Sequence, residues 1–390
     1  MPTINRPDWD IFCTVVDNFG DIGVCWRLAR QLASEHGMAV RLWVDDLRAF
    51  QPLCPQIDPQ QARQRLLGVD IRRWETPFPE AIPARTVVEA FACRIPDEFV
   101  AAMAQCEPRP VWINLEYLSA ENWVAGCHAL PSPHPRLPLT KYFFFPGFTP
   151  DTGGLLREKD LLARRQAFDA SPELQAGFWR ELGFAAPNAD ALTISLFAYE
   201  NPAILSLLQG CATARGQTCC LLPVSRALPE VEAFCGQALR PGDTIHRGAL
   251  EIRIVPFVEQ SRYDPLLWAC DLNFVRGEDS FVRAQWAARP MVWHIYPQQD
   301  DAHLVKLDAF LDLYCAGLPA GMADELRKLW HAWNAGAKPT EAAAVSWRAL
   351  WDEFLVNLPL LRTHSRRWAE QLAGQEDLSS ALVRFCRSKL

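Results

Sequence analysis

The sequence predicts an α/β protein built from two doubly wound, Rossmann-like domains with a helical C-terminal tail. Three observations lead to this prediction. Short apolar, β-branched runs alternate with segments of helical periodicity, which is typical of parallel sheets. Two glycine-containing turns each follow such a run and precede a helix, as at the ligand-binding edge of these sheets. The length of 390 residues exceeds what one hydrophobic core usually serves, so we expect two domains.

The composition is that of an ordinary globular protein, with 49% hydrophobic and 22% charged residues. A net charge of −7 and a pI near 5.7 argue against broad nucleic-acid binding. The 13 cysteines form no CxxC pair, so we expect reduced, buried thiols and no zinc site. No apolar run approaches the ~20 residues of a membrane span. We therefore expect a cytoplasmic protein that binds neither nucleic acid nor membrane.

The first half of the chain alternates between apolar runs and helical segments. Residues 130–150 are rich in proline and are expected to form a loop. The apolar runs that we expect to be strands span residues 11–16, 40–44, 68–74, 86–91 and 110–118, and expected helices span 24–33 and 96–104.

The second half repeats this alternation after a charged, helical stretch from about residue 155 to 181. The tail from residue 342 to 390 reads as helices with an apolar face. The expected strands of this half span residues 192–197, 218–224, 252–258, 271–275 and 290–295, and the apolar face of the tail includes Trp347, Leu350, Trp351 and Phe354.

Two facing doubly wound domains with a helical tail is the layout of the GT-B glycosyltransferases, although such an analogy of fold does not by itself establish function. We place the first domain at residues 1–165, completed by a C-terminal helix at about 368–390. A linker is expected at 166–184, and the second domain at 185–365.

The first glycine turn carries two carboxylates, Asp17 and Asp21, between an apolar run and a helix. Gly20 and Gly23 allow a tight turn and a close approach of the backbone to a ligand. Two like charges suit a phosphate poorly, but they suit a ligand that is cationic or must lose a proton. The alternative is that both aspartates are turn or N-cap residues.

The second turn is Arg276-Gly277-Glu278-Asp279-Ser280, again between a strand and a helix, with Ser280 or Asp279 expected as the N-cap. Backbone N–H groups and the Ser280 hydroxyl at a helix N-terminus can hold a diphosphate, and Arg276 can pair with it. Glu278 can accept hydrogen bonds from ribose hydroxyls. The alternative is an ordinary capping box with a surface arginine.

Phe257 follows another strand and can stack on a nucleotide base, or it can pack in the core. We expect no metal, because adjacent acidic pairs in loops rarely converge on one ion. No G-x-S-x-G motif is present, and His294 and His303 are expected to be structural, or to support other site residues, rather than to be catalytic.

Four segments together carry a family resemblance: residues 17–23 with Trp26-Arg27-Leu28-Ala29, residues 112–121, Phe145-Pro146-Gly147-Phe148, and residues 276–280. In combination they closely resemble the EarP family of protein-arginine rhamnosyltransferases, and the resemblance extends over effectively the whole chain.

The resemblance implies an inverting, metal-independent GT-B enzyme without a cofactor. Its family transfers L-rhamnose from dTDP-β-L-rhamnose to an arginine of elongation factor P, which activates the factor at polyproline stalls. The catalytic residues implied or suspected are Asp21 as general base, Asp17 as second carboxylate, and Glu278. The substrate-binding residues are Asn18, Phe19, Gly20, Phe197, Tyr199, Phe257, Gln260, Arg276, Asp279 and Ser280.

Elementary chemistry agrees with this reading. A guanidinium has a pKa above ~12 and is a poor nucleophile until a base takes a proton from it. Two carboxylates in one turn can take that proton and orient the group. Two other functions remain open from the sequence: a nucleotide-sugar epimerase or hydrolase on the same fold, and a non-catalytic nucleotide-sugar-binding adaptor.

Overall fold

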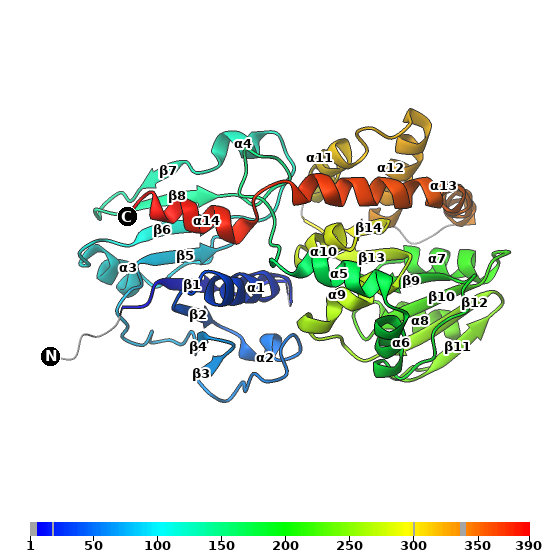
Figure 1. Cartoon of the computed structure of the whole chain (residues 1–390), viewed down its shortest axis with the longest axis horizontal. Helices are drawn as coiled ribbons and strands as arrows, with labels where there is room; N and C mark the ends of the chain where they lie inside the picture. The colour runs from blue at the N-terminus through cyan, green and yellow to red at the C-terminus, as the bar shows by residue number, and fades with distance from the viewer. Residues whose placement is uncertain (1–5, 18, 299–300, 336–340) are drawn as a thin grey trace. The chain divides into compact units, whose positions relative to one another are not determined.

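The structure, a computed structural model, describes residues 6–17, 19–298, 301–335 and 341–390, without the side chains of 341–346. The chain divides into two compact units (Figure 1). Unit 1 comprises Met1–Lys159 and Ala373–Leu390, and unit 2 comprises Asp160–Leu372. In the described part of the chain, no stretch of helix has the length and apolar character that a membrane span requires.

Unit 1 is built on a mixed sheet that has eight strands in the described residues, in the order β3-β4-β2-β1-β5-β6-β8-β7. The six inner strands are parallel, and only the edge strands β3 and β7 pair antiparallel with their neighbours. The strands are β1 (Trp9–Cys13), β2 (Val40–Val44), β3 (Arg63–Leu66), β4 (Val69–Arg73), β5 (Thr86–Ala90), β6 (Val111–Leu115), β7 (Pro131–Pro133) and β8 (Thr140–Phe144).

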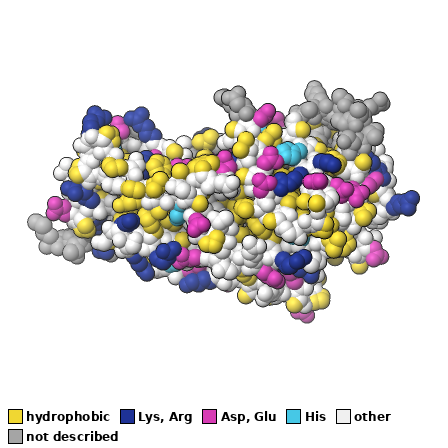
Figure 2. All heavy atoms as spheres, turned by 90° about the horizontal axis from the view of Figure 1, so that it is seen from above, with side chains coloured by type: hydrophobic (Ala, Val, Ile, Leu, Met, Phe, Trp, Pro, Cys, Tyr) yellow, Lys and Arg dark blue, Asp and Glu magenta, His cyan; other side chains and the backbone are white. Residues whose placement is uncertain are grey.

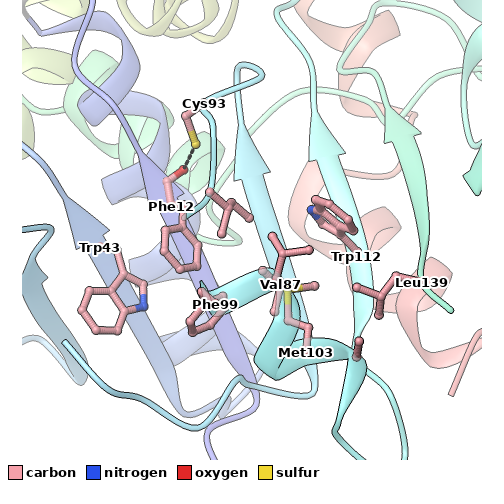
Figure 3. Packing of buried hydrophobic residues seen from close by; sticks show 11 residues of the cluster. Phe12, Trp43, Val87, Cys93, Phe99, Met103, Trp112 and Leu139 are labelled. Atoms are coloured by element: carbon pink, nitrogen blue, oxygen red, sulfur yellow. Dashed lines mark hydrogen bonds between the residues drawn. The ribbon is translucent and has the colours of Figure 1, made fainter. Parts of the chain in front are cut away.

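Helices cover both faces of this sheet. On one face, Phe99 and Met103 of α3 pack against Phe12, Trp43 and neighbouring apolar residues from β1, β2, β5 and β6 (Figure 3). On the other face, α1 contacts β1 and β2, and α14 contacts α1 and reaches β8 through the Phe385 ring. The helices of unit 1 are α1 (Gly20–Glu35), α2 (Leu47–Phe50), α3 (Asp97–Ala104), α4 (Trp123–Cys127) and α14 (Leu378–Arg387).

Unit 2 is built on a second sheet, with strand order β11-β12-β10-β9-β13-β14 among its described residues. Its strands are parallel except for the edge strand β11. The strands are β9 (Leu192–Leu196), β10 (Thr218–Pro223), β11 (Thr244–Arg247), β12 (Leu250–Val255), β13 (Leu272–Arg276) and β14 (Met291–His294). The helices are α5 (Leu161–Ala170), α6 (Pro172–Glu181), α7 (Ala203–Ala212), α8 (Leu228–Cys235), α9 (Gln260–Ala269), α10 (Asp279–Ala287), α11 (Ala302–Tyr314), α12 (Ala320–Asn334) and α13 (Glu341–Ala373).

Several elements differ from the sequence-based expectation. The stretch 130–150, expected to be a loop, contains the hairpin of β7 and β8, and the edge strands β3 and β11 were not anticipated. Residues 166–184, expected to be a linker, contain half of α5 and all of α6 and belong to unit 2, where aromatic residues such as Phe168 and Trp179 are buried. The strand expected at 11–16 ends earlier, at Cys13, and the helix that follows begins at Gly20.

Charged side chains of both signs lie on the surface. On the face in Figure 2, acidic and basic side chains are intermixed with apolar ones.

Buried ion pairs occur in both units: Arg41 with Asp10 in unit 1, and Arg283 with Asp264 in unit 2, each bidentate. Because both oxygens of each carboxylate are bonded, these buried charges satisfy each other.

Candidate active site

Unit 1 places the Asp21 carboxylate at the carboxyl edge of its sheet. Asp21 lies in the first turn of α1 and its side chain is only 2% exposed. Its Oδ2 accepts hydrogen bonds from the backbone N–H groups of Val16 and Asp17, both at 2.8 Å. Its Oδ1 accepts a hydrogen bond of 3.2 Å from the Tyr117 hydroxyl. One oxygen therefore holds the turn together, while the other is directed to Tyr117.

Asp17 lies directly over the start of the same helix. The Gly20 N–H donates to the Asp17 carbonyl at 2.6 Å, and a Cβ added at Gly20 would come within 2.8 Å of Asp17 Oδ2. Gly20 is thus needed so that the Asp17 carboxylate can approach the helix N-terminus, where the helix dipole favours a negative charge. The N-cap of α1 is Phe19, so neither aspartate occupies the N-cap position.

Neighbouring strands bring further side chains to this edge. Tyr117 follows β6, is 38% exposed, and stacks on Phe91, which follows β5, with ring centroids 4.4 Å apart. Phe91 has a positive φ of 56°, an uncommon conformation for a bulky side chain. Asp45, after β2, accepts the Val15 N–H at 2.9 Å, and burial raises its pKa. Sequence reasoning assigned no role to Tyr117 or Phe91, although both directly follow apolar strands.

In unit 2, aromatic rings surround the guanidinium of Arg276 at the carboxyl end of β13. Its central carbon lies 4.7 Å from the Phe197 ring centroid and 4.5 Å from that of Tyr199. Both rings follow β9, the strand next to β13, so the parallel pairing brings them to the cation. Rings stacked on a guanidinium hold its plane in one orientation, which prepares it to bind a diphosphate or other anion.

The turn after β13 differs in detail from the expectation. The N-cap of α10 is Glu278, not Asp279 or Ser280, because the first helical hydrogen bond runs from the Val282 N–H to the Glu278 carbonyl. The Ser280 hydroxyl instead donates to the Arg276 carbonyl and accepts the Arg276 N–H at 3.1 Å. Asp279, in the first turn, accepts a hydrogen bond of 3.2 Å from Gln260. The hydroxyl of Ser280 therefore shapes the turn.

Phe257 is half-buried after β12 and lies three positions before Gln260. The structure thus places the predicted residues in two groups, one in each unit. Unit 1 holds Asp17, Phe19, Gly20 and Asp21, and unit 2 holds Phe197, Tyr199, Phe257, Gln260, Arg276, Glu278, Asp279 and Ser280, whereas Asn18 lies outside the described residues.

His294 joins the second group, where the sequence suggested either a structural role or one in supporting site residues. It pairs in register with Arg276 across β13 and β14, and its ring packs edge-on against Tyr199. Burial, and then the nearby charge of Arg276, lower the pKa of His294 to about 3, so the ring is neutral at pH 7. Its buried Nδ1 has no hydrogen-bond partner among the described residues. A neutral ring with an unmet polar atom beside a cation suits contact with a polar ligand.

Comparison with known proteins decides the family. Residues 9–387 match the profile of the family described as "Elongation-Factor P (EF-P) rhamnosyltransferase EarP". The chain belongs to the EarP family. A family member from Pseudomonas aeruginosa, named protein-arginine rhamnosyltransferase, is 51% identical, and the match covers 97% of this chain and 98% of that protein.

Solved structures agree with this assignment. The structure described as the structural basis for EarP-mediated arginine glycosylation of translation elongation factor EF-P is 39% identical, with a TM-score of 0.70 over 99% of this chain and 100% of that one. MurG from Acinetobacter baumannii is 13% identical, with a TM-score of 0.50 over 98% of this chain and 100% of MurG, a likeness of fold alone. The EarP-family chain has the GT-B fold and the C-terminal helix predicted from its sequence.

Proposed function

We propose that this protein is an inverting glycosyltransferase that moves L-rhamnose from dTDP-β-L-rhamnose to an arginine side chain of elongation factor P, activating the factor for translation through polyproline stalls. The observation that carries the proposal is the fixed pair of carboxylates, Asp17 and Asp21, in a chain of the EarP family. Two carboxylates in one turn suit a cationic acceptor that must lose a proton.

The acceptor chemistry follows from the bonding of Asp21. A guanidinium nitrogen attacks the anomeric carbon as the bond from that carbon to the diphosphate oxygen breaks on the opposite side, which inverts the centre. The nitrogen's proton passes to a carboxylate. We assign it to Asp21 Oδ1, because Oδ2 already accepts two backbone N–H groups. Asp17 then orients the remaining guanidinium nitrogens. We assign Phe19 to the sugar, and Asn18 and Gly20 remain assigned to substrate binding on the family resemblance alone.

The donor chemistry falls to unit 2. The departing dTDP carries negative charge, which the Arg276 guanidinium and the N-terminus of α10 are suited to stabilise. We assign Phe197, Tyr199 and Ser280 to the diphosphate and the sugar, and Phe257 to stacking on thymine. Gln260, Glu278 and Asp279 are assigned to the nucleotide and ribose, and we assign Glu278 a role in catalysis as well.

The deciding experiment is intact-mass measurement of elongation factor P after incubation with the protein and dTDP-β-L-rhamnose. We expect a gain of one deoxyhexose on the wild-type factor and none when its acceptor arginine is replaced by lysine. Lysine keeps the charge but presents a compact ammonium, whereas two carboxylates can grip a planar guanidinium from different sides. A short peptide carrying the arginine should react more slowly than the folded factor, because a flexible peptide must be ordered on binding.

The release of dTDP, followed in the same reactions, separates the other functions. Release that depends on the factor supports transfer. Release without the factor would indicate a hydrolase, and binding without release would indicate an adaptor. Modification of the lysine variant would overturn the proposed grip on the guanidinium.

A further inference from the structure

The face of the unit 1 sheet that α3 covers continues beyond β2 to β4 and β3, and there it is lined with arginine. Because β2 and β4 are parallel and β4 pairs with β3, Arg41, Asp70 and Arg65 follow one another in register across the sheet. One pleat further along, Trp43, Arg72 and Arg63 are register partners. Residues in register on neighbouring strands point to the same face, so four guanidiniums share it.

This face forms the floor of a cavity of about 640 Å³, which lies wholly within unit 1. Arg6 and Pro7 line it from the segment before β1, and Ala81 and Ile82 line it from the segment before β5. Arg41 stands near the amino end of its strand, whereas Asp21 follows the carboxyl end of β1. The cavity and the candidate active site therefore lie at opposite ends of the parallel strands.

The positive charges in the cavity exceed the negative ones. Asp10, the register partner of Arg41 on β1, neutralises Arg41. Asp70 alone serves both Arg63 and Arg72, with nearest distances of 3.2 and 2.9 Å. The carboxylate of Glu80, which lines the cavity and is exposed, offsets one further charge. Five guanidiniums thus meet three carboxylates, in a chain whose net charge is −7.

Two of these arginines have no acidic partner among the residues described. Arg6 donates three hydrogen bonds, all to backbone carbonyls, of Pro83, Pro108 and Ala84, at 2.7 to 3.0 Å. These bonds fix the guanidinium without neutralising it. Arg65 is exposed on β3, and its side chain makes no hydrogen bond or ion pair within the described part of the chain. An anion that enters the cavity meets both charges uncompensated.

Arg41 and Arg72 are held in place before any ligand arrives. The ring of Trp43 has the guanidinium of Arg41 at 5.1 Å and that of Arg72 at 5.2 Å from its centroid. Arg41 is 5% exposed, and it also donates to the Ile82 carbonyl at 2.8 Å. Side chains that are already ordered lose little entropy when a ligand binds. Planar guanidiniums in fixed orientations favour ligands that accept paired hydrogen bonds.

We propose that this arginine-lined cavity of unit 1 binds a small polyanion of the phosphate class. Its volume lies within the range of about 300–1,000 Å³ typical of small-molecule sites. Arginine rather than lysine lines it throughout, as expected for bidentate recognition of phosphate oxygens. Val40, Ala81 and Ile82 add an apolar wall that can contact an organic portion of the ligand.

Titration calorimetry of the full chain with sodium tripolyphosphate tests this proposal. We expect one molecule to bind in the cavity, and Arg65→Gln to weaken binding by about ten- to a hundredfold, the range for one lost hydrogen bond between charged groups. Arg136→Gln is the matched control, since Arg136 is exposed in unit 1, carries the same charge and does not line the cavity. It should leave the affinity unchanged.

Two further arms locate the site and define its ligand. Binding should persist in Arg276→Ala, which removes the cation of the candidate donor site, so failure here is distinguishable from failure of the proposed function. Citrate should bind more weakly than tripolyphosphate, and a nucleoside triphosphate should bind more tightly if the apolar wall contacts its organic part. Absence of binding, equal affinity in Arg65→Gln and Arg136→Gln, loss of binding in Arg276→Ala, or equal affinity for citrate would each overturn the proposal.

Discussion

Asp21 combines two roles that two substitutions can separate. In Asp21→Asn the amide oxygen can still accept the N–H groups of Val16 and Asp17, while the NH2 faces Tyr117 and cannot take a proton. We expect this variant to fold normally and to lose about 10²–10⁴-fold in transfer rate. Asp21→Ala should lose the same activity and also about 1–3 kcal/mol of stability, because buried donors lose their acceptor. Thermal melts and rhamnosylation assays of both variants check this, and near-normal turnover of Asp21→Asn would exclude Asp21 as the base.

Arg276 offers a second test at the scale of one side chain. Arg276→Ala should weaken the binding of dTDP-rhamnose more than that of thymidine, because the guanidinium is assigned to the diphosphate. Phe257→Ala should weaken both by about 1–3 kcal/mol if its ring stacks on thymine. Calorimetry with the two ligands distinguishes these effects. Equal losses for both ligands in Arg276→Ala would contradict the diphosphate role.

The neutral ring of His294 makes stability depend on pH. Its pKa is about 3 in the folded state against an ordinary 6.5, so below pH 6.5 the unfolded chain takes up a proton that the folded chain does not. The contribution of the neutral His294 ring to the free energy of unfolding is fully present above pH 6.5. It is lost as pH falls toward 3, by up to about 1.4 kcal/mol per pH unit. Denaturant unfolding at pH 7, 6 and 5 measures the slope. His294→Gln should flatten it, and an unchanged slope would show that folding does not lower the pKa of this ring.

At the scale of secondary structure, the close approach at the start of α1 can be tested by adding one methyl group. Gly20→Ala places a Cβ 2.8 Å from Asp17 Oδ2 and must displace that carboxylate. We expect a loss of about a hundredfold in transfer rate, as for a comparable misplacement of reacting groups. Stability should change by less than ~1 kcal/mol, because alanine is the better helix former.

Gly177→Ala is the control for that substitution. Gly177 lies inside α6, and a Cβ there meets no atom within 4 Å. Alanine should stabilise this helix by about 0.5–1 kcal/mol without affecting turnover. If both glycine variants kept full activity, the position of Asp17 would not matter to the reaction.

The elements that could be predicted from the sequence are those with a strong burial signal. The strands β2, β5, β9 and β10 are rich in apolar residues and almost wholly buried, and they appear within a residue or two of the expected bounds. The edge strands β3 and β11 are largely exposed and charged, so no run of apolar residues marks them. The strand β8 lies among prolines that suggested a loop.

The same limit applies to the candidate site. Glycines and carboxylates in a strand-to-helix turn are visible in the sequence, and both turns were found. Tyr117 and His294 come from strands far from those turns in sequence, and only the pairing of β6 and β14 with their neighbours brings them in. The hydrogen bonds of the Ser280 hydroxyl to the backbone of Arg276 depend on the conformation of the turn. Residue spacing in the sequence does not determine that conformation.

At the scale of the whole molecule, the C-terminal segment belongs to unit 1. Gln31 of α1 hydrogen-bonds Asp377 at 3.1 Å, His36 bonds Ser379 at 3.0 Å, and Phe385 packs on Tyr142 and Phe144 of β8. Removing residues 373–390 should therefore destabilise unit 1 and leave unit 2 largely intact. Hydrogen exchange read by mass spectrometry should show lost protection in α1 and β8, with protection kept in β9 and β13. Full protection of α1 in the truncated chain would contradict this.

The chain passes from unit 1 to unit 2 after residue 159 and returns to unit 1 after residue 372, and this order has a consequence for biosynthesis. A ribosome completes residues 160–372, and with them all of unit 2, before it adds the helix that covers α1 and β8. Domains usually fold in the order in which they emerge. Synthesis of unit 1 begins first, but unit 1 can fold completely only after all of unit 2 has been made. Until then one face of the nascent unit 1 sheet stays uncovered. Slow translation or premature termination near residue 372 would leave that face open to chaperones and aggregation.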